Sequence, residues 1–156
     1  MRRRGLHRSS KSIVVDTSVF AEHVNASSPY RSKLNELFET SRSKVALFIP
    51  TVTLSETLYV LSRIYKLAGR PSPNSDALNY INWIKSRATT VGDEGLAISA
   101  GELKKELKLA LPDCYVIATA EKLNGIALFA KLEEEMKGGE KTLRKLRVSF
   151  VEEFVL

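Results

Sequence analysis

The stretch Ser12-Ile13-Val14-Val15-Asp16-Thr17-Ser18 decides the fold, because a short apolar segment ends abruptly at an acid. Its run of β-branched residues predicts a strand that is buried on both faces, as in a parallel sheet. In open α/β sheets, ligands bind in the crevice at the carboxyl ends of the strands. We therefore expect Asp16 to serve chemistry and not packing.

Two further acids stand alone in apolar surroundings. Glu56 is the only acid in the stretch 40–75, and Asp113 is the only acid in the stretch 107–120. Acids are rarely buried unless they are paired or bound to a metal. Together with Asp16 they predict one shared cation, Mg²⁺ or Mn²⁺, which prefer oxygen ligands. Such a site can activate a water for attack on phosphorus.

Each of these acids also fits a purely structural role. Asp16 could cap the helix that follows it, and Asp113 could favour the dipole of its own helix. Glu56 could complete a capping box with Thr53. Taken singly, the structural and functional interpretations weigh about equally, but three acids at strand or helix edges favour a common site.

Strands and helices alternate along the chain, which predicts an α/β fold with a small parallel sheet covered by helices. We expect a single domain over residues 12–156. Strands are predicted near residues 12–15, 45–49, 89–91, 126–129 and 148–150. Helices are predicted over 17–24, 30–40, from 53 or 55 to 67, around 78–84, and over 96–109 and 112–123, with a polar loop at 137–141.

The composition excludes several classes of protein. The chain has 156 residues with 44% hydrophobic content, enough for a real core. It has no apolar run of about 20 residues and no secretory signal, so we expect a cytoplasmic protein without a membrane span. Cys114 is the only cysteine and is predicted to be a core residue. With only His7 and His23 besides, a hydrolase with a Ser/His/Asp or Cys/His site is not expected.

The positive charge is concentrated at the N-terminus. The chain has 24 basic and 18 acidic residues; five of the basic residues lie in residues 1–11, which contain no acid, so 19 remain in the rest of the chain. We interpret residues 1–11 as a disordered basic tail that contacts RNA or is merely solvated. Its candidate RNA-binding residues are Arg2, Arg3, Arg4, Arg8 and Lys11.

Three segments resemble the central motifs of PIN-domain ribonucleases, in order and in spacing. They are Val14–Phe20, Ser55-Glu56 and Leu111–Ala120, which contains Pro112-Asp113. The resemblance extends from about Ile13 to the end of the chain. It is greatest to the small VapC-like toxins of prokaryotic toxin–antitoxin pairs.

The resemblance implies a Mg²⁺- or Mn²⁺-dependent endoribonuclease with a three-layer α/β/α fold. Asp16, Glu56 and Asp113 would be the catalytic and metal-binding acids. Thr17 or Ser18 would support Asp16 through hydrogen bonding.

One departure from the family pattern follows the strand at 126–129. The family often carries a fourth acid there, in a Thr-x-Asp setting, but this chain reads Ala130-Lys131-Leu132, followed by three glutamates at 133–135. Glu133 would replace the missing ligand after a small shift of the loop. Alternatively, residues 133–135 are a solvated run of charge on a helix.

The combined prediction is an endoribonuclease for single-stranded RNA, with an antitoxin protein as a possible partner. Homodimerisation is expected through the apolar helices around residues 58–67 and 78–84. The main alternative is a PIN-fold module that binds RNA or protein with little or no nuclease activity. A DNA-directed, structure-specific nuclease is weaker, because the chain lacks room for DNA-clamping elements.

Overall fold

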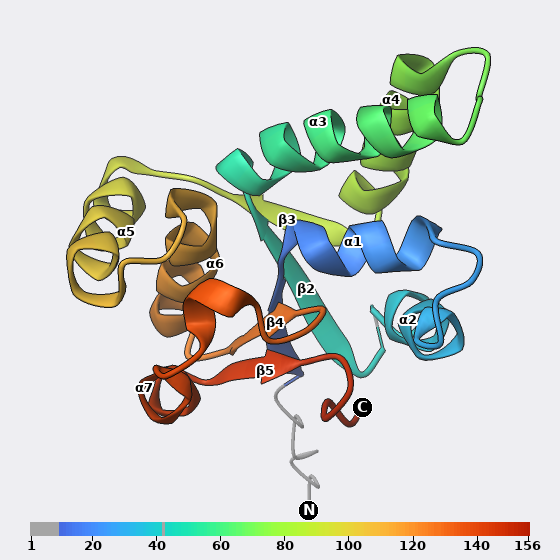
Figure 1. Ribbon diagram of the computed structural model, residues 1–156. Helices are drawn as coiled ribbons and strands as arrows, with labels where there is room; N and C mark the ends of the chain where they lie inside the picture. Colours follow the sequence, from blue (N-terminus) through green and yellow to red (C-terminus); the bar gives the residue numbers. More distant parts are fainter. Residues whose placement is uncertain (1–9, 42) are drawn as a thin grey trace, which may run out of the picture.

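The computed structural model describes residues 10–41 and 43–156, in which a five-stranded sheet lies between helices on both faces (Figure 1). Every pair of neighbouring strands is parallel, and the strand order is β3-β2-β1-β4-β5. The predicted α/β fold with a parallel sheet is confirmed. The strands are β1 (Lys11–Val15), β2 (Val45–Pro50), β3 (Ala88–Val91), β4 (Ile126–Phe129) and β5 (Val148–Phe150).

The helices form the outer two layers, as expected for a three-layer arrangement. In Figure 1, α5, α6 and α7 lie on one side of the sheet, α1 and α2 lie on the other, and α3 and α4 project together at the top. The helices are α1 (Thr17–Val24), α2 (Arg31–Glu39), α3 (Thr51–Leu67), α4 (Pro73–Lys85), α5 (Glu94–Leu107), α6 (Leu111–Lys122), α7 (Glu140–Lys145) and the short 3₁₀ helix η1 (Glu134–Met136).

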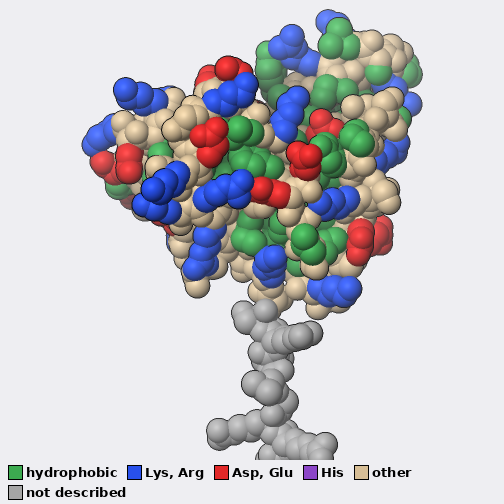
Figure 2. Space-filling model, turned by 60° about the horizontal axis from the view of Figure 1, so that its bottom comes forward, with side chains coloured by type: hydrophobic (Ala, Val, Ile, Leu, Met, Phe, Trp, Pro, Cys, Tyr) green, Lys and Arg blue, Asp and Glu red, His purple; other side chains and the backbone are tan. Residues whose placement is uncertain are grey.

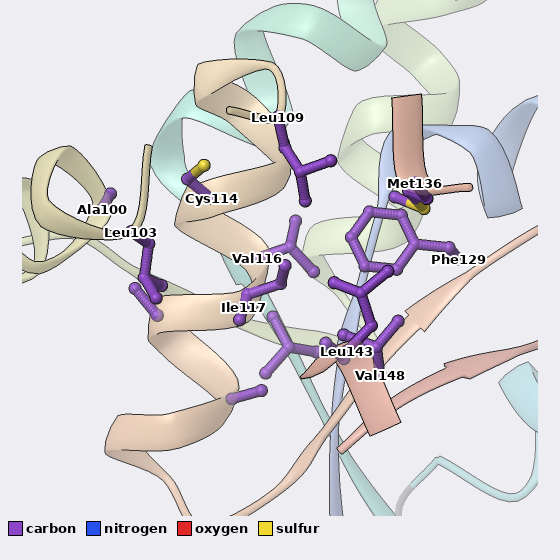
Figure 3. Packing of buried hydrophobic residues seen from close by; sticks show 14 of the residues in the cluster. Ala100, Leu103, Leu109, Cys114, Val116, Ile117, Phe129, Met136, Leu143 and Val148 are labelled. Carbon is purple, nitrogen blue, oxygen red and sulfur yellow. The ribbon is translucent and has the colours of Figure 1, made fainter. Parts of the chain in front are cut away.

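Alternate residues of β1 face two separate hydrophobic cores, because successive side chains of a strand point to opposite faces. Val14 packs with α5, α6 and α7, where Val116 and Phe129 lie close together (Figure 3). Ile13 and Val15 pack with the core on the α1 and α2 side. Burial on both faces explains the continuous apolar run in the sequence.

Helix α6 is buried on almost all sides, whereas the sequence predicted one inward face. Its residues 116–120 are buried without interruption, since the helix lies between α5 and the sheet. Cys114 is buried in the same core, so its prediction as a core residue is confirmed.

The strand order reverses at β1, and this reversal opens the crevice where α/β proteins bind ligands. The chain runs from β1 outward to β2 and β3, and then returns to pair β4 with the free side of β1. Gly125 makes the return possible, because a Cβ atom there would lie 2.6 Å from the carbonyl oxygen of Ser12.

Several predicted boundaries were wrong. Helix α3 begins at Thr51, directly after Pro50, without a side-chain cap. A polar cap often starts a helix, but here Pro50, the last residue of β2, has an extended backbone that leads directly into α3. Helix α5 ends at Leu107 because Lys108 adopts a left-handed conformation, with φ of 58°. Helix α7 was not predicted.

Strand β1 begins one residue earlier than the predicted domain, so Lys11, which was predicted to lie in a disordered tail, is part of the sheet. Lys11 belongs to β1 and pairs with Val45. Its ammonium lies 3.4 Å from the carbonyl oxygen of Val155 and 4.9 Å from the centre of the Phe154 ring. The calls on Arg2, Arg3, Arg4 and Arg8 lie outside the described residues. In residues 10–41 and 43–156, no helix has the length and apolar content to span a bilayer.

Candidate active site

Asp16 lies at the carboxyl end of β1 and begins α1. Its Oδ2 accepts a hydrogen bond of 2.8 Å from the backbone N–H of Ser18, so it caps the helix. Its own N–H donates to the carbonyl oxygen of Leu128 in β4, at 3.0 Å. The side chain is almost fully buried, and its Oδ1 has no hydrogen-bond partner in the described part of the protein. An orphaned carboxylate oxygen is costly unless something binds it.

Burial raises the pKa of Asp16 to about 6. Hydrogen bonds from the hydroxyl and the N–H of Ser18 act in the opposite direction, and the charges of Glu56 and Glu133 add to the rise. The carboxylates of Glu56 and Glu133 therefore lie within electrostatic range of Asp16.

Asp113 lies in the first turn of α6, where the chain enters the helix from α5. Its side chain is buried, and this burial together with the charge of Asp16 raises its pKa to about 8. Glu133 and Glu56 contribute further in the same direction. A carboxyl group with this pKa would be largely protonated near neutral pH unless a cation neutralised its neighbours.

Glu56 lies in the second turn of α3 and is half-buried. A hydroxyl pair brings this turn against α1, because the Oγ1 atoms of Thr17 and Thr57 lie 3.1 Å apart. Thr17 also donates to the carbonyl oxygen of Thr53, at 3.5 Å. No capping box forms, since the hydroxyl of Thr53 has no partner in the described residues and the helix starts two residues earlier.

Glu133 is half-buried and electrostatically coupled to the other acids. Burial and the charges of Glu135 and Glu56 raise its pKa, while Lys131 opposes the rise. The loop that carries it is attached to α1, because the N–H of Ala130 donates to the hydroxyl of Ser18 at 3.0 Å. Glu134, by contrast, is exposed and pairs with Lys137. The acidic run 133–135 is thus not uniformly solvated.

The four predicted acids, which lie at the end of β1, near the starts of α3 and α6 and in the loop after β4, are thus electrostatically coupled to one another. Among the residues described, no three acidic, His or Cys side chains are arranged as ready-made direct ligands of one metal ion. An all-oxygen donor set with a buried unpaired Oδ1 on Asp16 fits Mg²⁺, which takes one or two carboxylates and keeps several waters. Which acids bind directly stays a prediction.

Ser18, and not Thr17, makes the hydrogen bonds to Asp16. Its hydroxyl also holds the loop after β4, and that contact has no signal in the sequence because the two residues are 112 positions apart. The charge of Glu135, which raises the pKa of Asp113, was likewise missed. In the sequence, this role is indicated only by the position of the acidic run 133–135 shortly after the buried strand 126–129.

His23 takes no part in this site. Its Nδ1 lies 2.6 Å from the hydroxyl of Tyr80, and its Nε2 lies 2.7 Å from Oδ1 of Asn35. Its ring stacks on that of Trp83. It therefore joins α1 to α2 and α4, in agreement with the expectation that it has no nucleophile to activate.

Comparisons with known proteins find one family and several similar folds. Residues 13–136 match the family model of the PIN domain. No curated protein matches the chain. Its fold is similar to that of VapBC2 from Rickettsia felis, solved with a DNA fragment from its promoter (TM-score 0.64, 16% identity, covering 89% of this chain and 98% of that one).

Two further solved structures share the fold. One is VapC20 of Mycobacterium tuberculosis, a toxin described as cleaving the sarcin-ricin loop (TM-score 0.57, 18% identity, covering 81% of this chain and 95% of that one). The other is a toxin–antitoxin complex from Klebsiella pneumoniae (TM-score 0.61, 15% identity, covering 92% and 98%).

Proposed function

Because the chain belongs to the PIN domain family, we propose that it is a Mg²⁺- or Mn²⁺-dependent endoribonuclease that hydrolyses phosphodiester bonds in single-stranded RNA. The observation that carries this proposal is the electrostatic coupling of the buried Asp16 and Asp113 with Glu56 and Glu133, together with an Oδ1 of Asp16 that has no partner among the described residues. Carboxylates this close to one another, opposed only in part by Lys131, are unstable in their charged form unless a cation joins them.

The acidic side chains would have different roles in binding the cation. Asp16 and Asp113, the two buried acids, would hold the cation, with Glu56 and Glu133 completing its surroundings. When bound, the cation would neutralise charge on the phosphate and favour ionisation of a water. Ser18 fixes the orientation of Asp16, so that its Oδ1 remains available.

Cleavage of a labelled single-stranded RNA tests the proposal. Cleavage should require Mg²⁺ or Mn²⁺ and should stop in EDTA. Asp16→Asn and Asp113→Asn keep the shape of the side chain but remove its charge, so each should abolish cleavage while the circular dichroism spectrum stays unchanged. Glu102→Gln, which alters an exposed acid on α5, is the matched control and should cleave at the wild-type rate.

Glu133→Gln tests the fourth acid separately. If Glu133 supports the cation, its neutralisation should slow cleavage about 10- to 100-fold, as the loss of a supporting group does in other metal sites. Glu134→Gln, which alters the solvated neighbour, should leave the rate unchanged. Equal cleavage rates for wild type and Glu133→Gln would show that Glu133 does not support the cation and belongs to a solvated run of charge.

We further propose that the protein is the toxin of a toxin–antitoxin pair and acts in the cytoplasm. The similar structures from Rickettsia felis and Klebsiella pneumoniae are toxin–antitoxin assemblies, which supports an antitoxin partner for this fold. The test is to purify the product of a small gene adjacent to the gene for this protein. Addition of that product should inhibit cleavage, and a lack of complex formation between the two would contradict the pairing.

A homodimer is supported by exposed apolar side chains on the α3–α4 projection. Tyr59 is 61% exposed, Leu67 is 86% exposed and Leu78 is 43% exposed. Sedimentation velocity should show a dimer, and Leu67→Lys combined with Leu78→Lys should convert it to a monomer. A monomeric wild type would contradict this assignment.

The second candidate is an RNA- or protein-binding module without nuclease activity. The observation that favours it is Ala130-Lys131-Leu132, which stands in place of the Thr-x-Asp pattern. A wild type that binds RNA but cleaves none of a varied set of RNAs in Mg²⁺ or Mn²⁺ would establish this alternative.

A further inference from the structure

The amino edge of the sheet, at the opposite end from the acids, is lined with cations. Four of the five strands begin at a basic residue or directly after one, whereas β4 begins after Gly125. The basic residues are Lys11 in β1, Lys44 before β2, Arg87 before β3 and Arg147 before β5.

Strand order and register place these cations along one edge of the sheet, with β4 between Lys11 and Arg147. Lys11 is in register with Val45, the residue after Lys44. In the same way, Ala88 pairs with Leu47 of β2, and Val148 pairs with Ala127 of β4. With neighbouring strands about 4.8 Å apart, the row extends across roughly 19 Å.

None of the four cations is neutralised by an ion pair among the described residues. Lys11, Lys44 and Arg147 are exposed, and Arg87 is half-buried with its guanidinium 4.3 Å from the centre of the Trp83 ring. Arg147 donates one N–H to the carbonyl oxygen of Asn124, which leaves most of its five N–H groups for a ligand.

A hollow lies within this row, where β4 contributes no cation. It has a volume of about 630 Å³, and Lys11 and Arg147 line it together with Ser12, Asn124 and Gly125. Figure 2 views the molecule from this end, and lysine and arginine side chains outnumber acids across the face. Two acids, Glu39 and Glu121, line smaller hollows beside Arg87 and Arg147 without pairing with them.

We propose that this row of cations is a second nucleic-acid contact, which binds the phosphodiester backbone of an RNA or DNA segment away from the acidic site. A linear row of unpaired cations around a shallow hollow suits a chain of phosphates, each of which is neutralised by one or two basic groups. Strand β1, with 5 residues, separates this edge from Asp16 by about 17 Å, so the two sites can engage different segments of one nucleic acid. The proposal does not depend on nuclease activity.

The test measures binding of a fluorescein-labelled single-stranded RNA and of a DNA with the same sequence, in EDTA so that no cleavage takes place. The neutral variant combines Lys44→Gln, Arg87→Gln and Arg147→Gln in the full chain. The control variant removes the same charge from exposed positions on α3 and α5, through Arg63→Gln, Lys66→Gln and Lys105→Gln.

The neutral variant should bind about tenfold or more weakly at low salt, and the slope of log Kd against log salt should fall by about 2, since each lost phosphate contact removes about 0.7. A charge-conserving variant with Lys44→Arg, Arg87→Lys and Arg147→Lys should bind like the wild type, which separates charge from folding. If the neutral variant loses affinity equally for RNA and DNA, the row contacts the phosphodiester backbone that both share. If it loses affinity for RNA alone, the row binds RNA.

Two results would overturn the proposal. One is a neutral variant with the wild-type slope for both nucleic acids. The other is a control variant whose slope falls as much as that of the neutral variant, because net charge alone would then explain the change. Since cleavage is not measured, neither result bears on the acidic site.

Discussion

Ser18 connects two parts of the candidate site that are far apart in the sequence. Its N–H and hydroxyl both stabilise the charged form of Asp16, and its Oγ accepts the N–H of Ala130 at the start of the loop that carries Glu133. One small side chain thereby fixes a carboxylate and positions a loop. An apolar residue of similar size would keep the N–H bond to Asp16 but would lose the hydroxyl that holds the loop.

Ser18→Ala should therefore raise the pKa of Asp16 further above its ordinary value and slow RNA cleavage by about tenfold or more, as the loss of an outer-shell partner does in metal sites. Ser18→Thr keeps the hydroxyl and should restore both properties. Carbon-detected NMR titration of the carboxyl groups measures the pKa. An unchanged pKa with unchanged cleavage would show that the backbone N–H alone positions Asp16.

The raised pKa values of Asp16 and Asp113 predict how stability depends on pH. In the folded protein these groups bind their protons more tightly than in the unfolded chain, where the ordinary pKa is 3.8. Their contribution to the free energy of unfolding is therefore complete below about pH 4, and it is lost as the pH rises through about 6 and then about 8. The metal-free protein should become less stable between about pH 4 and pH 8.

Mg²⁺ should reverse this trend, because it competes with the protons for the same carboxylates. The rise in the free energy of unfolding on adding Mg²⁺, measured by urea denaturation, should be larger near pH 8 than near pH 5. Asp113→Asn should remove most of the pH dependence. A metal effect that is the same at both pH values would contradict a shared carboxylate site.

Buried hydroxyl groups connect helix α3 to α1. Thr53 and Thr57 are both fully buried in this helix, but among the described residues only the hydroxyl of Thr57 has a partner, which is Thr17. The two threonines are thus a matched pair in the same helix. Any change in helix propensity on substitution by valine is the same for both.

Thr57→Val should destabilise the fold by about 1 kcal/mol and leave the hydroxyl of Thr17 poorly satisfied. Thr53→Val should be neutral or stabilising, because it removes a buried hydroxyl that has no partner. Chemical denaturation of the two variants gives the comparison. Equal destabilisation would mean that the contact between Thr17 and Thr57 contributes nothing specific to the position of Glu56.

At the scale of the whole molecule, charge divides along the strands, with acids at the carboxyl edge of the sheet and cations at the amino edge. The chain enters the sheet at the basic edge, since Lys11 is the first residue of β1. The four arginines among residues 1–9 immediately precede that edge in sequence.

Deletion of residues 1–9, which have little apolar content, should change the free energy of unfolding by less than about 0.5 kcal/mol. It should also lower the salt slope of RNA binding by up to about 3, because four basic groups are lost. Extending the deletion to Lys11 should destabilise the protein further, since this residue pairs in the sheet. An unchanged salt dependence of RNA binding would show that these arginines serve solubility and do not contact RNA.

Much of the fold was predictable because its elements are defined by local patterns. The apolar runs at 12–15, 45–49 and 126–129 gave three buried strands, and Asn124-Gly125 correctly marked the end of α6. The start of α3 was predicted wrongly because Pro50 continues the strand and leads directly into the helix. Helix α7 was missed because its six residues are too short for an apolar period to be recognised.

The sequence by itself determined that the protein has a parallel sheet and which acids are isolated in apolar surroundings, since strand burial and residue type are local properties. Only the tertiary structure decided that Glu133 is coupled to the other acids, that Ser18 attaches its loop, and that four cations lie along the opposite edge. Each of these features depends on the pairing of β1 with β4 and β2, and long-range pairing brings together residues whose separation in the chain carries no periodic signal.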